Sequence, residues 1–540
     1  MKKLLLIFIF PFFGWSKPLD FNQDVRPILS DKCFSCHGPD EHGRKADLRL
    51  DIEKEAKHEK LMAIVAGKPD ESEMIYRIHS DEEEELMPPP EIGKPLSQRE
   101  KEILEQWIKE GAIWADHWAY VDPVKHSQPQ VIDSNWPTHW IDRFTLADIK
   151  KNQLKPAPDA DPITLVRRLH FDLTGLPPTP QEVTNFATNP SPRAYASLID
   201  DLLASPHFGE RMTAYWLDLV RYADTVGYHG DQPHNISPYR DWVINAFNQN
   251  MPFDQFTREQ LAGDLLPGST TQQKVASGYN RLLQTTHEGG LQIKEYDAIY
   301  AADRVRNVSE VWMGATVGCA QCHDHKYDPY TIKDNYALAA FFADIGDRGF
   351  NGNSLPTKRP PEIIIHNPEN LARIQHLQKE MNALVPPANQ KKFQEFQNRK
   401  NRLISTLKKA KEKDKQDLQN KLGNLNQEIS KLAGEQELAR YRKIRREKVE
   451  IEKMGRPTMI SQAVKPRTMR VLPRGNWMDE SGPVVLPAVP EFLGQIKSNK
   501  DRLNRLDLAN WLTNPKNGKG KLNARVLANL MQENTRCVLR

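Results

Sequence analysis

Cysteine is scarce in this sequence: five of its 540 residues are cysteine. Secreted domains that rely on disulfide bonds are dense in cysteine, so this count excludes a disulfide scaffold. Four of the five fall in two Cys-x-x-Cys-His motifs about 285 residues apart, namely Cys33, Cys36 and His37, and Cys319, Cys322 and His323. The fifth, Cys537, stands alone near the C-terminus and is either a free thiol or the mark of an abnormal terminus.

The chain also lacks a strong net charge and long apolar runs. A formal net charge of +4 gives no reason to expect nucleic acid as a partner. The apolar run Leu4–Phe13 is shorter than the roughly 20 residues that span a bilayer. Lysines before this run and small residues after it, Gly14 and Ser16, predict a signal peptide over 1–16 that is cut before Lys17. A retained anchor and a buried N-terminal helix are the alternatives.

This signal peptide predicts a mature protein that is periplasmic or otherwise exported, in an oxidising compartment. We find no other candidate for a transmembrane segment. The mature chain is therefore expected to have no stable membrane span.

Strand signals are few, whereas capped segments with apolar residues at a 3.6-residue period are frequent. Ser97 and Glu100, for example, form a capping box before a helix whose apolar face includes Leu104 and Trp107. The length fits about three or four domains. We therefore predict a mainly α, multi-domain protein. Its expected parts are the signal peptide 1–16, a small helical module 17–116, a Pro-rich linker 117–136, a larger helical domain 137–367, a polar helical segment 368–453, and an incomplete third domain 454–540.

The polar segment 368–453 carries sparse apolar residues, such as Leu418, Leu422, Leu425 and Ile429, three or four positions apart. This spacing predicts a long two-helix hairpin or a coiled coil. Such a segment serves either as a solvated spacer or as a binding surface, and the spacer is the simpler interpretation.

Covalently bound c-type haem explains both cysteine motifs economically. The two thiols add to the vinyl groups of haem as thioethers, and the adjacent histidine supplies a nitrogen to iron. Attachment follows export, in agreement with the predicted signal peptide. Zinc binding, a thioredoxin-like redox pair and a disulfide within each motif are the alternatives. The predicted residues for two covalent haems c are Cys33, Cys36, His37, Cys319, Cys322 and His323.

The opposite side of each iron needs its own ligand or stays open. For the first iron we expect Met87, in a loop made rigid by three prolines, although core packing would also explain this residue. Thioether opposite imidazole raises the reduction potential and closes the iron to small ligands, which favours electron transfer. For the second iron the candidates are His287 and Met313, with His229 and His234 as weaker ones, or an open position that admits peroxide.

Several polar residues follow the second motif directly. They are Asp324, His325, Lys326 and Asp328. They either orient His323 through hydrogen bonds or shape a turn.

Longer stretches around the motifs resemble the planctomycete cytochrome c family, large exported proteins that pair a small cytochrome module with two domains of unknown function. The stretches FNQDVRPILSDKCFSCHGPD, MPPP and LSQREKEILEQWIKEGA are similar to the cytochrome module. LVRRLHFDLTGLPPTPQEV, YWLDLVRYADTVGY and ADRVRNVSEVWMGATVGCAQCHDHKYDP are similar to the middle domain, and PRGNWMDESGPVVLPAVPEFL and RLDLANWLTNP to the start of the third. The resemblance covers nearly the whole mature chain. It implies that residues 17–116 form a cytochrome c-like module with haem on Cys33, Cys36 and His37, and Met87 as its sixth ligand.

One feature departs from the family. Its third domain usually continues farther, whereas this chain ends shortly after LNARVLANLM with an atypical QENTRCVLR. The sequence therefore looks truncated or frameshifted there.

Together these observations predict an exported di-haem, cytochrome c-like protein that transfers electrons to an unidentified redox partner. The first alternative is an enzyme, a di-haem peroxidase or oxidase whose second haem is catalytic. The second is a non-haem interaction protein with zinc or disulfides at its cysteine pairs. No motif defines a substrate or an oligomeric state.

Overall fold

Helices dominate the structure, a computed structural model that describes residues 18–40, 43–131, 136–228, 231–286, 290–346, 359–409, 412–517 and 519–536. The mainly α, multi-domain fold predicted from the sequence is confirmed. Within these ranges no helix combines the length and apolar character needed to cross a bilayer. The predicted signal peptide, His229, His287 and Cys537 lie outside the described residues.

Strands form three short antiparallel pairs in the described part of the chain. The pairs are β1 (Thr225–Val226) with β2 (Gln232–Pro233), β3 (Glu362–Ile365) with β4 (Arg456–Met459), and β5 (Met469–Arg470) with β6 (Val484–Val485). In the longest pair, Glu362 lies opposite Met459 and Ile365 opposite Arg456. These pairs are too small to form a sheet core, so the packing that holds the molecule together is between helices.

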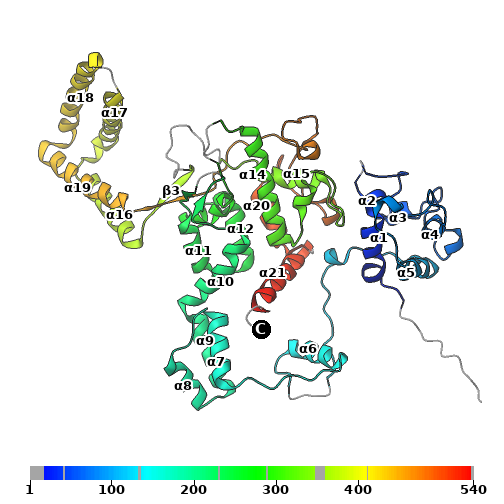
Figure 1. Ribbon diagram of the computed structural model, residues 1–540. Coiled ribbons are helices and arrows are strands. Elements are labelled where there is room, and N and C mark those ends of the chain that lie inside the picture. Colours follow the sequence, from blue (N-terminus) through cyan, green and yellow to red (C-terminus); the bar gives the residue numbers. More distant parts are fainter. Residues whose placement is uncertain are drawn as a thin grey trace, which may run out of the picture.

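The N-terminal unit, residues 18–116, is a cluster of short helices around its own core (blue in Figure 1). Its helices are the π-helix η1 (Phe21–Val25), α1 (Arg26–Lys32), α2 (Phe34–His37), α3 (Glu53–Ala56), η2 (Pro69–Glu71), α4 (Glu73–His79), η3 (Pro90–Ile92) and α5 (Gln98–Lys109). The predicted capping box at Ser97 and Glu100 starts α5. Leu29 and Leu104 are fully buried, and each such side chain stabilises the fold by about 1.5–3 kcal/mol.

The middle region begins with helices whose first turns are set by local sequence. α7 to α10 each start at a proline that follows a capping Asp, Thr or Ser, which is where proline suits a helix. The α-helices of this region are α6 (Trp140–Lys151), α7 (Pro162–Leu173), α8 (Pro180–Thr188), α9 (Pro192–Ala204), α10 (Pro206–Leu219), α11 (Ser237–Asn248), α12 (Phe253–Ala262), α13 (Thr271–Ala276), α14 (Ile293–Val308) and α15 (Ile332–Ala340). Its short helical turns are η4 (Trp118–Tyr120), η5 (Gly263–Leu265), η6 (Ser277–Arg281), η7 (Ser309–Met313) and η8 (Val317–Gln321).

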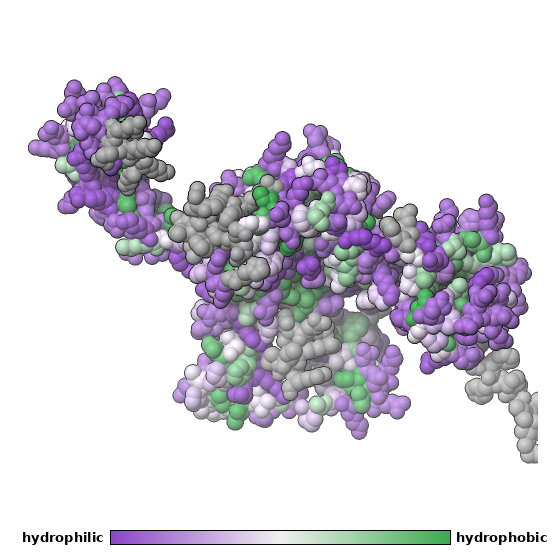
Figure 2. Space-filling model, turned by 45° about the horizontal axis from the view of Figure 1, so that its top comes forward, coloured by the Kyte–Doolittle hydropathy of each residue, from purple (hydrophilic) through white to green (hydrophobic). Residues whose placement is uncertain are grey.

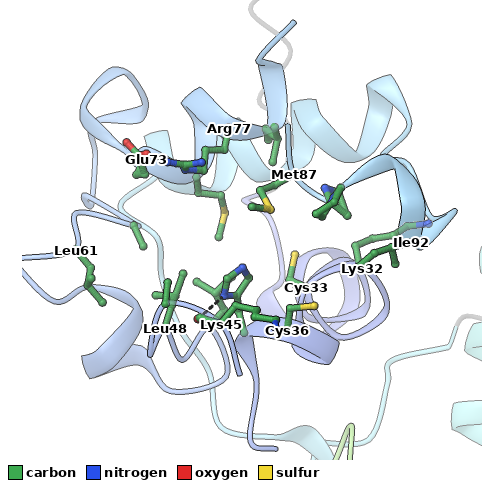
Figure 3. A pocket seen from close by; sticks show the side chains of 18 residues that line it. Lys32, Cys33, Cys36, Lys45, Leu48, Leu61, Glu73, Arg77, Met87 and Ile92 are labelled. Carbon is green, nitrogen blue, oxygen red and sulfur yellow. Dashed lines mark hydrogen bonds and ion pairs between the residues drawn. The ribbon is translucent and has the colours of Figure 1, made fainter. Parts of the chain in front are cut away.

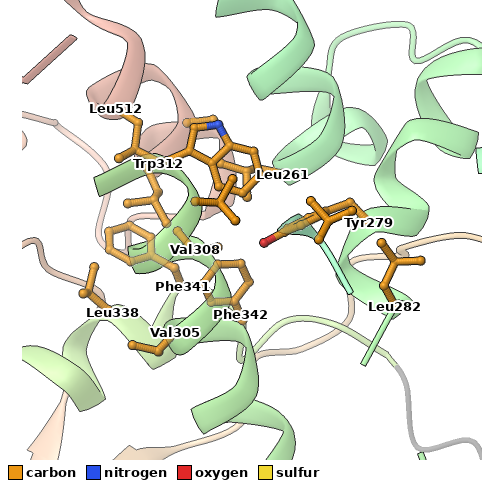
Figure 4. Packing of buried hydrophobic residues seen from close by; sticks show 14 of the residues in the cluster. Leu261, Tyr279, Leu282, Val305, Val308, Trp312, Leu338, Phe341, Phe342 and Leu512 are labelled. Carbon is orange, nitrogen blue, oxygen red and sulfur yellow. The ribbon is translucent and has the colours of Figure 1, made fainter. Parts of the chain in front are cut away.

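The largest core joins the middle region to the C-terminal region. Tyr279, Trp312 and Phe341 are almost fully buried in it, and Leu512 from α20 (Arg505–Thr513) packs into the same cluster (Figure 4). The remaining C-terminal elements are η10 (Pro473–Gly475), η11 (Glu491–Leu493), η12 (Pro515–Asn517) and α21 (Lys519–Arg536). The C-terminal region thus completes the core of the middle region.

Arg505 fixes α20 on this core. Its guanidinium is fully buried and donates to both carboxylate oxygens of Asp264 at 2.8 Å and to Asp344 at 3.0 Å. It also donates to the Leu261 carbonyl oxygen at 2.9 Å. A buried cation of this kind is tolerated because two carboxylates and a carbonyl take up its donors.

Residues 368–453 form a helical arm that projects from the middle region beyond the β3–β4 pair (yellow in Figure 1). Its helices are α16 (Pro368–Ala383), η9 (Pro387–Asn389), α17 (Gln390–Lys409), α18 (Glu412–Ala433) and α19 (Glu435–Lys453). Leu377, Phe393, Leu425 and Ile429 are buried between them, while the face of the arm seen in Figure 2 is mostly hydrophilic. The predicted helical segment is therefore present, and a coiled coil stays a prediction.

Candidate cofactor site

The first Cys-x-x-Cys-His motif forms one side of a cavity. Cys33 follows α1, and its backbone N–H continues the helix to the Leu29 carbonyl at 2.9 Å. Cys36 and His37 follow in α2, where the His37 N–H bonds to the Cys33 carbonyl at 2.9 Å. All three residues line a cavity of about 400 Å³, which lies within the range of small-molecule and cofactor sites. Burial raises the pKa of the Cys33 thiol to about 12, and the nearby Cys36 and Asp31 add to this rise.

Most of the cavity wall is apolar. The apolar residues include Leu48, Leu50, Ala63, Ile78, Pro88 and Ile92. Lys32, Lys45 and Arg77 also line it, and Arg77 donates to Glu73 at 2.8 Å. An apolar body with cations at its edge suits a flat cofactor that carries carboxylates, because each part then meets its complementary surface.

The His37 imidazole is held so that one nitrogen is available. Its Nδ1 lies 3.3 Å from the Lys45 carbonyl oxygen, and an N–H at this position donates to that oxygen. This arrangement leaves the lone pair of Nε2 free to bind a metal. Metal-bound histidines are held in the same way when a carbonyl orients their other nitrogen. Burial is the main cause that lowers the pKa of His37. This shift favours the neutral ring, which is the form that binds iron.

Met87 lies across the cavity from the two cysteines, with its side chain extending toward Cys33 (Figure 3). Its backbone N–H donates to the Arg77 carbonyl at 3.1 Å, which ties the proline-rich loop to α4. The predicted thioether and the predicted imidazole thus line one cavity. A second methionine, Met74 of α4, also lines it, and sequence reasoning missed this residue because a methionine in an amphipathic helix has the pattern of core packing.

These side chains fit covalent haem c. Two thiols, a histidine with a free Nε2 and a thioether line a single cavity with apolar walls and a cationic edge. The set combines the proximal and distal ligands of a Met/His cytochrome c. Their assignment as ligands stays a prediction.

The second motif has different surroundings. Cys319 lies in η8, and Cys322 and His323 follow; all three side chains are exposed. The Nδ1 of His323 lies 2.7 Å from the carbonyl oxygen of Asp324, so an N–H there is satisfied locally and Nε2 is available. The Cys322 sulfur lies close to Gly475, where an added Cβ would come within 2.8 Å of it. The second motif is thus a surface site, whereas the first faces a cavity.

The polar residues after the second motif shape a turn. His325 is buried, its Nδ1 accepts from the backbone N–H groups of Tyr327 (3.2 Å) and Asp328 (2.9 Å), and its Nε2 lies 2.9 Å from the Thr316 hydroxyl. Asp324 accepts from the backbone N–H of Ile332 at 2.7 Å. Of the two interpretations offered by the sequence, these contacts favour the turn.

Two of the proposed sixth ligands of the second iron can be located. Met313 packs against the main core and lines a small cavity of about 30 Å³ with Tyr120 and Tyr330. His234 is buried, and burial together with Arg359 and Arg281 lowers its pKa to about 4. The lining of the Met313 cavity does not include the second motif. The sixth ligand of the second iron stays a prediction.

Zinc and disulfide alternatives find little geometric support in the described residues. Cys33, Cys36, Cys319 and Cys322 are free thiols. No three His, Cys, Asp or Glu side chains in the described ranges are grouped so that they could hold a metal ion. The two cysteine pairs therefore do not combine into a four-ligand zinc site there.

The start of the predicted linker ties the N-terminal unit to the middle region. The Asn22 side chain donates at 2.8 Å to the carbonyl of Asp116, the last residue before the linker. His117, the first residue of the linker, reaches the middle region, because its Nε2 lies 3.1 Å from Asp328 Oδ1. Tyr120 packs edge-on against Tyr330, with ring centroids 5.9 Å apart. The linker is thus anchored next to the turn that follows the second motif.

Charges from the two units also meet across this junction. Burial lowers the pKa of Arg26, and the carboxylate of Asp328 opposes that change. Burial raises the pKa of Asp324, Asp40 adds to the rise and Arg49 opposes it. Asp40 and Asp324 each follow a Cys-x-x-Cys-His motif within three residues. The two motifs therefore lie on the two sides of one junction.

Comparisons with known families agree with this geometry. Residues 33–91 match the family described as Planctomycete cytochrome C. This match agrees with the family resemblance that the sequence predicted. Residues 140–347 match a second model, described as a protein of unknown function (DUF1549), which includes the second motif. A comparison with curated proteins found no match, and neither did one with solved structures.

The match to the cytochrome c model covers most of the residues that line the first cavity, including Cys33, His37 and Met87. The predicted family is therefore confirmed, and a cytochrome-like function follows for this part of the chain. The DUF1549 match gives the middle region a family but no activity.

Proposed function

We propose that this protein is an exported electron-transfer cytochrome with haem c bound covalently to Cys33 and Cys36. In this proposal, His37 and Met87 would hold its iron. The observation that carries it is that both thiols, the imidazole and the thioether line one apolar cavity. Haem c bound there would supply a one-electron iron couple, which a Met/His ligand pair poises at a raised potential.

The residues of the chain have separate parts in this function. The Lys45 carbonyl orients the His37 ring and fixes its tautomer. Leu48, Leu50 and Ile78 keep water from the cavity, which favours the less charged, reduced form of the cofactor. Met87 would supply a thioether to the iron, which would disfavour binding of small ligands and therefore favour electron transfer over oxygen chemistry.

The proposal includes a second haem c at Cys319, Cys322 and His323. The motif chemistry and the available Nε2 of His323 support it. The junction between the N-terminal unit and the turn after the second motif, through His117 and Asp328, would keep the two haems in a fixed relation. Two haems held there would supply two one-electron couples for exchange with a redox partner outside the chain.

Export to the periplasm or beyond is part of the same proposal. The residue pattern of 1–16 supports it, because thioether attachment to haem follows export in c-type cytochromes. Expression with and without this segment, in a host that has haem-maturation machinery, tests the point. Haem attachment is expected only for the chain with its signal.

The experiment that tests the proposed function is a haem count combined with a potential measurement. Wild type is compared with the double variants Cys33→Ala/Cys36→Ala and Cys319→Ala/Cys322→Ala. Each double variant is expected to carry one covalent haem fewer than wild type. The haem that remains in the second variant should have the raised potential of a Met/His site and should not bind added cyanide readily. A colourless wild-type protein after correct export would contradict the proposal.

The same measurements address the di-haem peroxidase or oxidase suggested by the sequence. Its catalytic iron would be the one at His323, with an open sixth position. Ligand binding confined to the haem lost in Cys319→Ala/Cys322→Ala would favour the enzyme over a simple electron carrier.

A further inference from the structure

A second large cavity lies between the middle and C-terminal regions. Its volume is about 530 Å³. Residues of α14 and α15 form one side, and the segment that leads from Arg467 through β5 to Glu480 forms the other. Gln321, between the two cysteines of the second motif, lies on its wall. No function proposed above uses this cavity.

One wall of the cavity is lined by small side chains. Ala298, Ala301 and Ala302 are three and four positions apart on α14 and therefore share one face of the helix. Ala339 of α15 adds to this wall, and Trp477 lines the same cavity. Small residues let a flat ring approach the helix closely, and an indole offers such a ring a stacking partner.

The charged groups of the cavity leave one positive charge in excess. Lys294 pairs with Glu480 at 2.5 Å, and Arg467 lies 3.9 Å from Asp297. Arg470 donates one N–H to the Gly482 carbonyl at 3.3 Å, and no carboxylate of the described residues forms an ion pair with it. A guanidinium has five N–H donors, and its planar shape matches a carboxylate.

A buried amide gives an independent sign of a missing partner. Asn335 of α15 lines the cavity and is 2% exposed. Its Oδ1 accepts no hydrogen bond from the described residues. An amide oxygen buried without a donor costs free energy, so a ligand hydroxyl or N–H that reaches it would be favoured.

We propose that this cavity binds a small aromatic carboxylate that carries a hydroxyl group. The ring would lie against the alanine wall near Trp477, the carboxylate would meet Arg470, and the hydroxyl would donate to Asn335. The inference is independent of haem at either motif, since it uses none of the haem-binding residues.

Calorimetric titration with three related probes tests the proposal. 4-Hydroxybenzoate should bind, benzoate should bind more weakly because it lacks the hydroxyl donor, and 4-hydroxybenzamide should not bind detectably because it lacks the charge. Arg470→Gln is expected to weaken 4-hydroxybenzoate binding at least tenfold, and Asn335→Leu should remove the advantage of 4-hydroxybenzoate over benzoate.

Three controls make the result decisive. Arg446→Gln removes an exposed arginine on the distant arm and should change nothing. Ala302→Phe fills the cavity and should abolish binding even if Arg470→Gln does not fold. Cys319→Ala/Cys322→Ala should bind like wild type, which separates this site from the proposed second haem. No binding of 4-hydroxybenzoate to wild type, or equal binding to wild type and a folded Arg470→Gln variant, would overturn the inference.

Discussion

Replacement of Arg505 by methionine tests how the C-terminal region is held on the middle region. The side chain is fully buried, and Asp264 and Asp344 are 6% and 12% exposed. Arg505→Met keeps the approximate volume and removes the cation. Both carboxylates and the Leu261 carbonyl then lose their donor inside the core.

The expected loss is large because the carboxylates stay behind. Removing one partner of a buried ion pair costs about 3–5 kcal/mol, and this cation serves two carboxylates. Arg505→Lys keeps the charge but offers three donors in place of five, so we expect an intermediate loss of about 1–3 kcal/mol. Arg373 provides a matched surface control: it pairs with Glu447 at 2.5 Å, and both side chains are 45% exposed. Arg373→Met should cost less than about 1 kcal/mol.

Native-state hydrogen exchange read by mass spectrometry is the suitable assay, since the chain has several cores and need not unfold in one step. Peptides from α20 should lose protection in Arg505→Met, while peptides from α1 and α5 should keep theirs. The reasoning is refuted if Arg505→Met destabilises α20 no more than Arg373→Met does.

Three further predictions concern the functional regions. His234 has a pKa of about 4 in the folded protein and about 6.5 in the unfolded chain. Between these two pH values the unfolded state binds more protons, so the free energy of unfolding should fall by about 3 kcal/mol as pH drops from 6.5 to 4. Urea titrations of His234→Gln should show a smaller fall. Asp328→Asn should loosen the linker at His117 by about 1–2 kcal/mol; unchanged proteolysis within 117–131 would contradict this. Met87→Leu should lower the potential of the first haem and let cyanide bind, whereas Met74→Leu should change neither; equal effects in redox titrations would rule out Met87 as the ligand.

Much of the first site could be predicted from the sequence because its signals are local. Cys33, Cys36 and His37 are adjacent in the chain, and the loop that carries Met87 is marked by three prolines. The Lys45 carbonyl that orients His37 carries no such signal, since any residue supplies a carbonyl. The position of Met74 on the cavity wall also has no local sequence signal, because it depends on how α4 packs on the rest of the unit.

The surroundings of the second motif depend on contacts between distant parts of the chain. The sequence of Cys319 and Cys322 is equivalent to that of the first pair, yet here both thiols are exposed. The segment around Gly475, more than 150 positions later, sets the space next to Cys322. The anchoring of His117 by Asp328 is likewise a long-range contact that no local pattern encodes. Helix starts, by contrast, were predictable because capping acts within a few residues.

Mass mapping of the exported protein tests the central claim most directly. After digestion, the peptide that contains Cys33, Cys36 and His37 is measured for added porphyrin mass, with the same peptide from Cys33→Ala/Cys36→Ala as the control. We predict one haem on the wild-type peptide, bound through both sulfurs, and none on the control. An unmodified wild-type peptide from correctly processed protein, made where other c-type cytochromes mature, would contradict the account.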